Sequence, residues 1–341
     1  MTTVKTILFL GTTGYIGGSV LDALLDHPNA GKFDITTYFR SEEKAKKREK
    51  HLGLKTISGS FDVVREAAAK VDLVINCASS DDLALTEAVL AGAKKHFAST
   101  KVPTLLLHTS GTGVALDKAV GTYSAGPPLD DTDSATINAL PSDKWHRNVD
   151  IPILKANREG YITSYTVYPG IIFGPATGRF VKIGLQRPTP TGELIIALDV
   201  LKRGAPGVIG PMKNTWNFVE IRDTANLYML IFDAIVTGKK IASGVDGHYV
   251  AENGSLEVGP YFRAIGQALY ELKAIKSAEE TQFTPEELKG ELGSIYVQFA
   301  HNTRTSSTRS RSLGWQPKVP ARAVLDQIKG NMKTLVEGMN A

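Results

Sequence analysis

The stretch V-K-T-I-L-F-L-G-T-T-G-Y-I-G-G, residues 4–18, decides the fold class of this chain of 341 residues. A short apolar strand runs directly into glycines at 11, 14 and 17, and segment 19–25 then has the character of a helix. Glycine permits a tight turn, and a helix N-terminus offers free N–H groups and positive potential to an anion. Because the three glycines lie between a strand and a helix, they predict a site for a dinucleotide diphosphate. The residues assigned to this part of the site are Gly11, Thr13, Gly14, Tyr15, Ile16 and Gly17.

Composition narrows the function classes. Hydrophobic residues make up 42% and charged residues 22%, which is ordinary for a globular protein. The net charge of +4 is small and its basic residues are scattered, so no nucleic-acid partner is expected. The single cysteine, Cys77, excludes an internal disulfide and is expected to be a small buried residue. No long apolar span and no leader segment is recognised, so we expect a cytoplasmic protein without a membrane partner.

Strand-like and helix-like segments alternate through the first half of the chain, which predicts a parallel sheet covered on both faces. Residues 114–143 contain many turn formers and predict a long loop with a broken helix. The loop acids Asp117, Asp130, Asp131 and Asp133 are interpreted as solvated, and no metal site is predicted. The predicted strands are 7–10, 33–39, 54–57, 71–76, 104–108 and 161–168, and the predicted helices include 41–51, 62–69, 83–94, one from about 144, and 321–339.

Four segments in order along the chain resemble the extended short-chain dehydrogenase/reductase superfamily. They are the glycine turn at 11–17, Y-P-G-I-I-F-G-P at 168–175, W-N-F-V-E-I-R-D at 216–223 and L-G-W-Q-P at 313–317. Within the superfamily, the chain is similar to atypical members of the NmrA-like or fungal NAD-dependent epimerase/dehydratase-like kind. Each segment is weak alone, and together they indicate the superfamily without specifying a reaction.

The resemblance implies an α/β fold, a Rossmann-type doubly wound parallel sheet with a smaller C-terminal substrate-binding lobe. It implies an NAD(P)-binding domain from residues 1–170 plus about 215–250, and a substrate lobe from 171–214 and 251–341. Relatives often pair through helices beside the sheet, so a monomer or a homodimer is expected.

The resemblance also implies which residues contact the cofactor. The residue that ends the second strand selects between NAD and NADP, and here it is Arg40, with Lys44 one helical turn later. A base at this position favours NADP over NAD, because it can bind the 2′-phosphate. Further residues that match the cofactor groove are Asp62 near the adenine, Ala78 and Ser79 at its floor, Thr109 at the end of the fifth strand, and Pro169, Ile171 and Ile172 against the nicotinamide.

The chain departs from the superfamily in its proton-transfer residues. The usual Ser or Thr after the fifth strand is matched by Ser110 (or Thr109), but none of the 11 tyrosines begins a Tyr-x-x-x-Lys motif. His146 is a candidate acid/base, because imidazole titrates near neutrality, and Arg147 would then resemble the lysine that binds the nicotinamide ribose. Tyr123 in the glycine-proline loop is a second candidate. In a third interpretation the protein has no catalytic dyad. Ser110 or water is then the proton source, or the protein binds the cofactor without turnover.

These observations favour an NADP-dependent oxidoreductase of the atypical extended type that reduces a small carbonyl or enone metabolite. The first alternative is a non-catalytic NAD(P)-binding regulator, because the usual dyad is missing. The second alternative is an epimerase or dehydratase for a nucleotide sugar. The catalytic residues assigned are Ser110, His146 and Tyr123, and the sequence leaves the substrate open.

Overall fold

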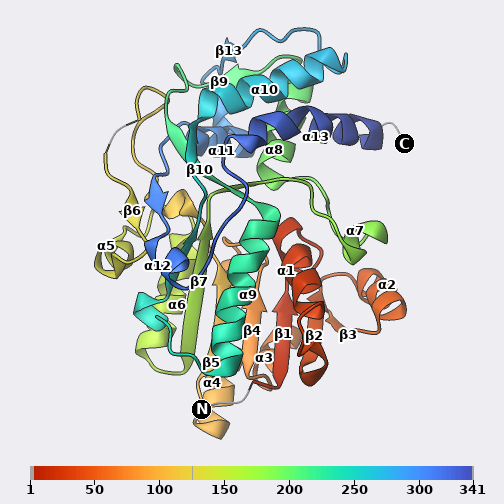
Figure 1. Cartoon of the computed structure of the whole chain (residues 1–341), viewed down its shortest axis with the longest axis vertical. Coiled ribbons are helices and arrows are strands. Elements are labelled where there is room, and N and C mark those ends of the chain that lie inside the picture. Colours follow the sequence, from red (N-terminus) through yellow and green to blue (C-terminus); the bar gives the residue numbers. More distant parts are fainter. Residues whose placement is uncertain (1–3, 125, 340–341) are drawn as a thin grey trace.

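A parallel sheet of seven strands forms the centre of the protein (Figure 1), in the order β11-β7-β5-β4-β1-β2-β3. The structure is a computed structural model that describes residues 4–124 and 126–339, without the side chains of 44, 48, 50–52, 291, 292 and 294. The predicted α/β class with a parallel sheet is confirmed. The strands are β1 (Thr6–Leu10), β2 (Asp34–Phe39), β3 (Lys55–Ser58), β4 (Leu73–Asn76), β5 (Thr104–Thr109), β7 (Ile162–Pro169) and β11 (His248–Ala251).

Helices cover both faces of the sheet, and β1 is correspondingly apolar on both of its sides. Ile7 and Phe9 lie in one hydrophobic core, whereas Leu8 and Leu10 lie in another on the opposite face. This is the period-two alternation of a strand that is buried twice. Helices α1 (Tyr15–Leu25) and α9 (Ile221–Thr237) cover the first face, and α3 (Phe61–Ala68), α4 (Leu83–Thr100) and α6 (Arg147–Arg158) cover the second.

The order of the strands reverses beside β1, which has β2 on one side and β4 on the other. The pairing of β1 with β4 places Leu10 opposite Asn76, and the Cys77 amide donates to the Leu10 carbonyl at 3.1 Å. Both strands therefore end at the same level. A crevice opens at such a switch point in doubly wound sheets, beyond the carboxyl ends of the strands.

Apart from the cores on the two faces of the sheet, a separate hydrophobic core, which we call the second core, lies beyond this edge and gathers residues from segments that are distant in sequence. Its small sheet has the order β12-β10-β8, and α10 packs against α8 and α13. The domain boundaries given above stay a prediction. The elements are β8 (Ile171–Phe173), α8 (Thr191–Arg203), β10 (Thr215–Glu220), β12 (Ser255–Glu257), α10 (Val258–Glu271), α11 (Glu291–Phe299) and α13 (Ala323–Met339).

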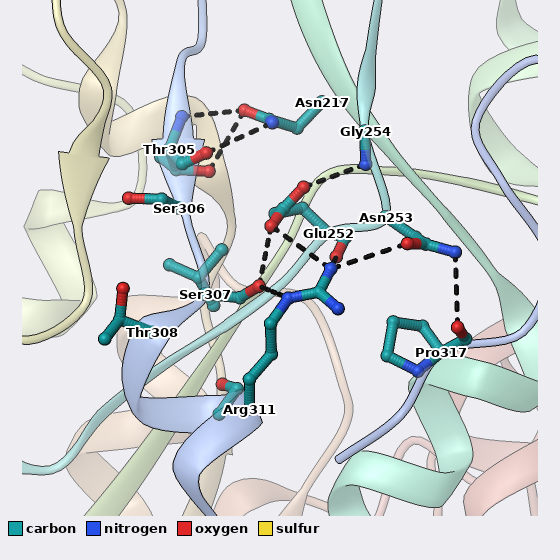
Figure 2. Close-up of polar contacts among 12 residues, drawn as sticks. Asn217, Glu252, Asn253, Gly254, Thr305, Ser306, Ser307, Thr308, Arg311 and Pro317 are labelled. Atoms are coloured by element: carbon teal, nitrogen blue, oxygen red, sulfur yellow. Dashed lines mark hydrogen bonds and ion pairs between the residues drawn. The ribbon is translucent and has the colours of Figure 1, made fainter.

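A cluster of polar side chains fastens the late part of the chain to the end of β11 (Figure 2). Glu252 accepts hydrogen bonds from the Ser307 hydroxyl at 2.6 Å and from the Gly254 amide at 2.9 Å. Arg311 donates to Ser307 and to the backbone carbonyl of Glu252, and Asn253 donates to Val319. We call these residues the Glu252 cluster: Glu252, Asn253, Ser307 and Arg311.

Several predicted elements differ in extent from the observed ones. The helix predicted to end near residue 94 runs on to Thr100, where Lys101 stops it with a left-handed φ of 61°. The helix predicted from about 144 begins at Arg147, because His146 has a φ of 66°. None of the described helices has an apolar run long enough to cross a bilayer. The remaining elements are α2 (Glu42–Leu52), β6 (Leu129–Asp130), α5 (Ser134–Ala139), α7 (Arg179–Lys182), β9 (Gly207–Val208), β13 (Thr281–Gln282), β14 (Thr305–Ser306), α12 (Thr308–Ser312) and four short 3₁₀ turns at 30–32, 112–115, 244–246 and 287–289.

Candidate functional site

A cleft of about 660 Å³ opens at the carboxyl edge of the sheet. One wall is formed by the glycine turn after β1 and by the ends of β2, β4 and β5. The other wall is formed by residues of α8, α11 and β10, which belong to the second core. The cleft therefore lies at the switch point of the sheet, where the sheet meets the second core.

The glycines of the turn have different roles: two allow close backbone packing and one precedes helix α1. Gly11 has a φ of +83°, and a Cβ there would lie 2.3 Å from the carbonyl oxygen of Cys77. A Cβ at Gly17 would lie 2.2 Å from the carbonyl oxygen of Gly11, so both positions require glycine for close backbone packing. Gly14 precedes α1 in an extended conformation, and no side chain caps the helix. The first N–H groups of α1 are thus left for an anion in the cleft, which fits the diphosphate of a dinucleotide.

Arg40 lies at the end of β2 and lines the cleft next to Tyr38. Its side chain is exposed, and none of the ion pairs found among the described residues involves it. No acidic residue stands at this strand end, where an acid would bind the ribose 2′-OH of NAD. The guanidinium therefore fits an additional phosphate at the adenosine end of a dinucleotide.

Most residues predicted from the sequence meet in this one cleft. Gly17 lies beneath the turn rather than at its surface, and the side chain of Lys44 lies outside the described part of the structure. The predicted residues that line the cleft are Gly11, Thr13, Gly14, Tyr15, Ile16, Arg40, Ala78, Ser79, Thr109, Ser110, His146, Pro169, Ile171 and Ile172.

Three predicted residues lie elsewhere. Asp62 is exposed on α3, forms an ion pair with Arg65 at 2.7 Å and borders a separate hollow under that helix. Arg147 is buried and donates to the carbonyls of Asn138 in α5 and of Leu140 just after it, so its guanidinium supports the segment before α6. Tyr123 is 43% exposed and does not line the cleft. The loop runs outside the cleft at this residue, and the catalytic role of Tyr123 stays a prediction.

His146 is held in the cleft by a carboxylate. Its Nδ1 lies 3.0 Å from Oδ1 of Asp81 and 3.1 Å from Oγ of Ser80, and its ring stacks on Trp145 with centroids 4.9 Å apart. Partial burial alone would raise the pKa of Asp81, but the hydrogen bond and charge of His146 lower it. Nε2 faces Gly111, where a Cβ would lie only 2.8 Å away. With Nδ1 bound to Asp81, Nε2 is the nitrogen that remains for chemistry in the cleft.

Ser110 is positioned by a second carboxylate. Its hydroxyl donates to Oδ2 of Asp150 at 3.1 Å, and Asp150 lies one helical turn after His146. Asp150 is 2% exposed, and Arg147 Nη1 lies 3.9 Å from the same oxygen. Burial raises the pKa of Asp150 to about 6, against the opposing charges of His146 and Arg147 and the hydrogen bond of Ser110. The cleft thus contains a hydroxyl and an imidazole, each fixed by its own acid.

Two other groups near the cleft have structural roles, and the burial predicted for Cys77 is confirmed. His108 is buried in β5 and pairs with the Asn76 amide at 3.3 Å, and burial lowers its pKa to about 3. Cys77 is buried at the end of β4, and burial raises the pKa of its thiol to about 12. Neither group is suited to proton transfer near neutral pH.

The aromatic residues that line the cleft beside His146 were not assigned to the site from the sequence. Trp145, Trp216 and Phe299 line the cleft and contact one another in series, with ring centroids 6.5 and 5.2 Å apart. Ile195 and Ile295 extend this surface, which we call the aromatic wall. These residues come from four distant segments, so only the folded chain brings them together. The wall is suited to an apolar ligand beside His146.

Comparison with known proteins supports the fold. No family model matches the chain. A curated relative, the oxidase ucsJ of an Acremonium species, is 25% identical over an alignment of 341 positions that covers 93% of this chain and 94% of the relative.

Among solved structures, the PbgP3 protein of Burkholderia pseudomallei matches with a TM-score of 0.66 and 16% identity, over 98% of each chain. A dTDP-glucose 4,6-dehydratase of Bacillus anthracis, solved with NAD, gives 0.60 and 13% over 98% of each chain. The yeast methylglyoxal/isovaleraldehyde reductase Gre2, solved with NADPH, gives 0.57 and 14% over 97% of this chain and 99% of its own. The resemblance to extended short-chain dehydrogenases/reductases is therefore confirmed at the level of the fold.

Proposed function

We propose that this protein is an NADP-dependent oxidoreductase that reduces the carbonyl or enone group of a small apolar metabolite. The observation that carries this proposal is the position of His146 and Ser110 in the same cleft as the glycine turn. The turn and Arg40 would hold a phosphorylated dinucleotide, and the aromatic wall lines the same cleft, with Trp145 stacked on His146.

The cofactor half of the proposal is supported by the turn and by Arg40. Backbone N–H groups at the start of α1 would hold the diphosphate, and Arg40 would hold the 2′-phosphate. Solved structures of the same fold contain NAD in one enzyme and NADPH in another, so the fold accommodates either nucleotide. Arg40 favours NADP in this chain.

The chemical half of the proposal assigns the proton to His146. When bound, the reduced nicotinamide supplies a hydride to the substrate carbon. His146, protonated and oriented by Asp81, donates a proton from Nε2 to the oxygen of a carbonyl or to the enolate of an enone. When Asp150 is protonated, its carboxyl O–H donates to the Ser110 oxygen. The Ser110 hydroxyl is then free to donate a hydrogen bond to the same substrate oxygen. The overall change is addition of one hydride and one proton to the substrate.

The substrate class follows from the aromatic wall. Trp216 is buried and its indole N–H already donates to a backbone carbonyl at 2.8 Å, so it presents carbon surface to the cleft. Trp145 and Phe299 continue that surface. An apolar body lying on these rings would direct its reducible group toward His146.

A direct test is to mix the purified protein with NADPH and a panel of aldehydes, quinones and enones, and to follow the absorbance of the reduced nicotinamide. We expect consumption with at least one apolar member of the panel, and much slower consumption with His146→Ala. Tight NADPH binding without turnover of any compound would instead support a non-catalytic regulator, which is the alternative suggested by the missing Tyr-x-x-x-Lys motif.

A further inference from the structure

We propose, on the premise that the cleft binds a nicotinamide nucleotide, that Arg187 is a second cation of the cofactor site and binds the diphosphate from the wall opposite the glycine turn. Arg187 lines the same cleft as Gly14, Tyr15 and Ile16. No sequence motif pointed to it, because it precedes α8 and reaches the turn only through the fold.

The neighbouring residue fixes the position of Arg187. The Gln186 amide donates to the backbone carbonyl of Tyr15 at 3.0 Å and to the Ser19 hydroxyl at 2.9 Å. Gly18 makes room for it, since a Cβ there would lie 2.3 Å from the Gln186 amide carbon. Gln186 therefore attaches the segment before α8 to the first turn of α1. Arg187, the next residue, is held beside the helix N-terminus that would receive the diphosphate.

The guanidinium of Arg187 is not neutralised by an acid. Its Nη2 donates to the Thr191 hydroxyl at 2.8 Å, and no ion pair to a carboxylate is found for it within residues 4–124 and 126–339. Arg179, in the same connection, differs in that it forms ion pairs with Asp22 at 2.6 Å and with Asp26. Thr191 also lines the cleft, so its hydroxyl orients the guanidinium without cancelling its charge. Such a cation, exposed at the cleft and oriented by a hydroxyl instead of a carboxylate, is suited to a ligand anion.

The location favours the diphosphate over a substrate anion. The α1 N-terminus, to which Gln186 attaches this segment, adds its own positive potential from the facing wall of the cleft. The wall next to His146 is lined instead by Trp145, Trp216 and Phe299, which offer no charge to a carboxylate. The diphosphate would thus be held from one side by N–H groups and from the other by a guanidinium.

This arrangement separates the roles of the two arginines. Arg40 would contact only the 2′-phosphate, which NADPH has and NADH lacks. Arg187 would contact the diphosphate, which both nucleotides carry. Because Arg187 precedes a helix of the second core while the glycine turn belongs to the sheet, the bound nucleotide would also bridge the two walls of the cleft.

The experiment is a calorimetric titration of NADPH and of NADH into the wild type and three variants. We expect Arg187→Ala to weaken both nucleotides by a similar factor of about 10, as for loss of a charged hydrogen bond. Arg40→Ala should weaken NADPH by about 10-fold and leave NADH within about twofold. Lys182→Ala is the matched control, because Lys182 is an exposed cation of α7 that does not line the cleft, and it should change neither affinity.

Two further measurements keep the outcome unambiguous. Arg187→Lys keeps the charge and should restore part of the affinity, which a merely structural role of Arg187 would not explain. Unchanged affinity of Arg187→Ala for both nucleotides, with a raised KM for the carbonyl substrate, would overturn the proposal and assign Arg187 to the substrate. If the wild type binds neither nucleotide, the proposed function itself fails instead.

Discussion

The cleft and the Glu252 cluster lie at the same edge of the protein, but they differ in whether their polar atoms have hydrogen-bond partners. In the Glu252 cluster (Figure 2), both carboxylate oxygens of Glu252 accept hydrogen bonds, and Arg311 donates to Ser307 and Asn253. At the cleft, Oγ1 of the lining residue Thr112 is buried without a hydrogen-bond partner, and so is Oδ1 of Asp150, the acid that holds Ser110 from behind the cleft wall. A satisfied network stabilises one conformation, whereas unpaired groups cost stability and persist where a ligand uses them. The Glu252 cluster is thus satisfied without a ligand, whereas polar groups at the cleft are not.

The largest effect is expected at His146. His146→Ala removes the proton donor and should lower kcat by about 10²–10⁴-fold. The affinity for NADPH should stay within about twofold, because the nucleotide contacts lie elsewhere in the cleft. Stopped-flow turnover and calorimetric titration of the same sample measure both quantities. A variant that keeps full kcat would show that the cleft charges are as structural as those of the Glu252 cluster.

The raised pKa of Asp150 predicts that the free energy of unfolding depends on pH. This pKa of about 6 lies above the ordinary value of 3.8, so the folded state keeps this proton to a higher pH than the unfolded state. The stability from this group is present at low pH and is lost as the pH rises from about 4 through 6. Asp150→Asn removes the loss and should gain on the order of 2 kcal/mol relative to wild type between about pH 4 and pH 7.5. Urea unfolding at both pH values checks this, and parallel curves would contradict it.

Substitution of Glu252 should lower the stability, in contrast to the gain expected for Asp150→Asn. Glu252→Gln weakens the hydrogen bonds to Ser307 and Gly254 and the ion pair to Arg311, so the free energy of unfolding should fall by about 1–2 kcal/mol. NADPH affinity should not change. A urea midpoint together with a titration measures both. Loss of nucleotide binding with unchanged stability would show that the cluster is part of the functional site.

The smallest effect is expected at Tyr123. It is exposed and outside the cleft, so Tyr123→Phe should leave kcat and KM within about twofold. Steady-state kinetics with the best substrate of the panel are sufficient. A drop of more than about tenfold would mean that the loop closes over the cleft and that the comparison above omits a catalytic group.

The sequence predicted the sheet and the glycine turn well, because residues 4–18 combine a strand signal, a turn signal and a helix signal in one continuous segment. The position of Arg40 at the cleft was predictable for a related reason, since it follows from its place at a strand end. Asp81 was not predictable, because it pairs with His146 across 65 positions of sequence. The aromatic wall and Arg187 depend on the same kind of long-range contact.

One error shows where composition misleads. Asp131 was interpreted as a solvated loop acid, but it is fully buried. Its carboxylate accepts backbone N–H groups of Arg309, Ser310 and Val250, and so it joins the start of α12 to β11. Neighbouring Asp130 and Asp133 are partly or fully accessible, and the sequence offers no periodicity in this loop that distinguishes the three. Burial of a charge in a loop is decided by distant partners.

The central claim is that the cleft holds a phosphorylated nicotinamide dinucleotide, and calorimetric titration of the wild-type protein tests it most directly. The account predicts saturable binding of one NADPH per chain, with NADH at least about tenfold weaker because it lacks the phosphate facing Arg40. Absence of heat and of saturation with both nucleotides would contradict the account.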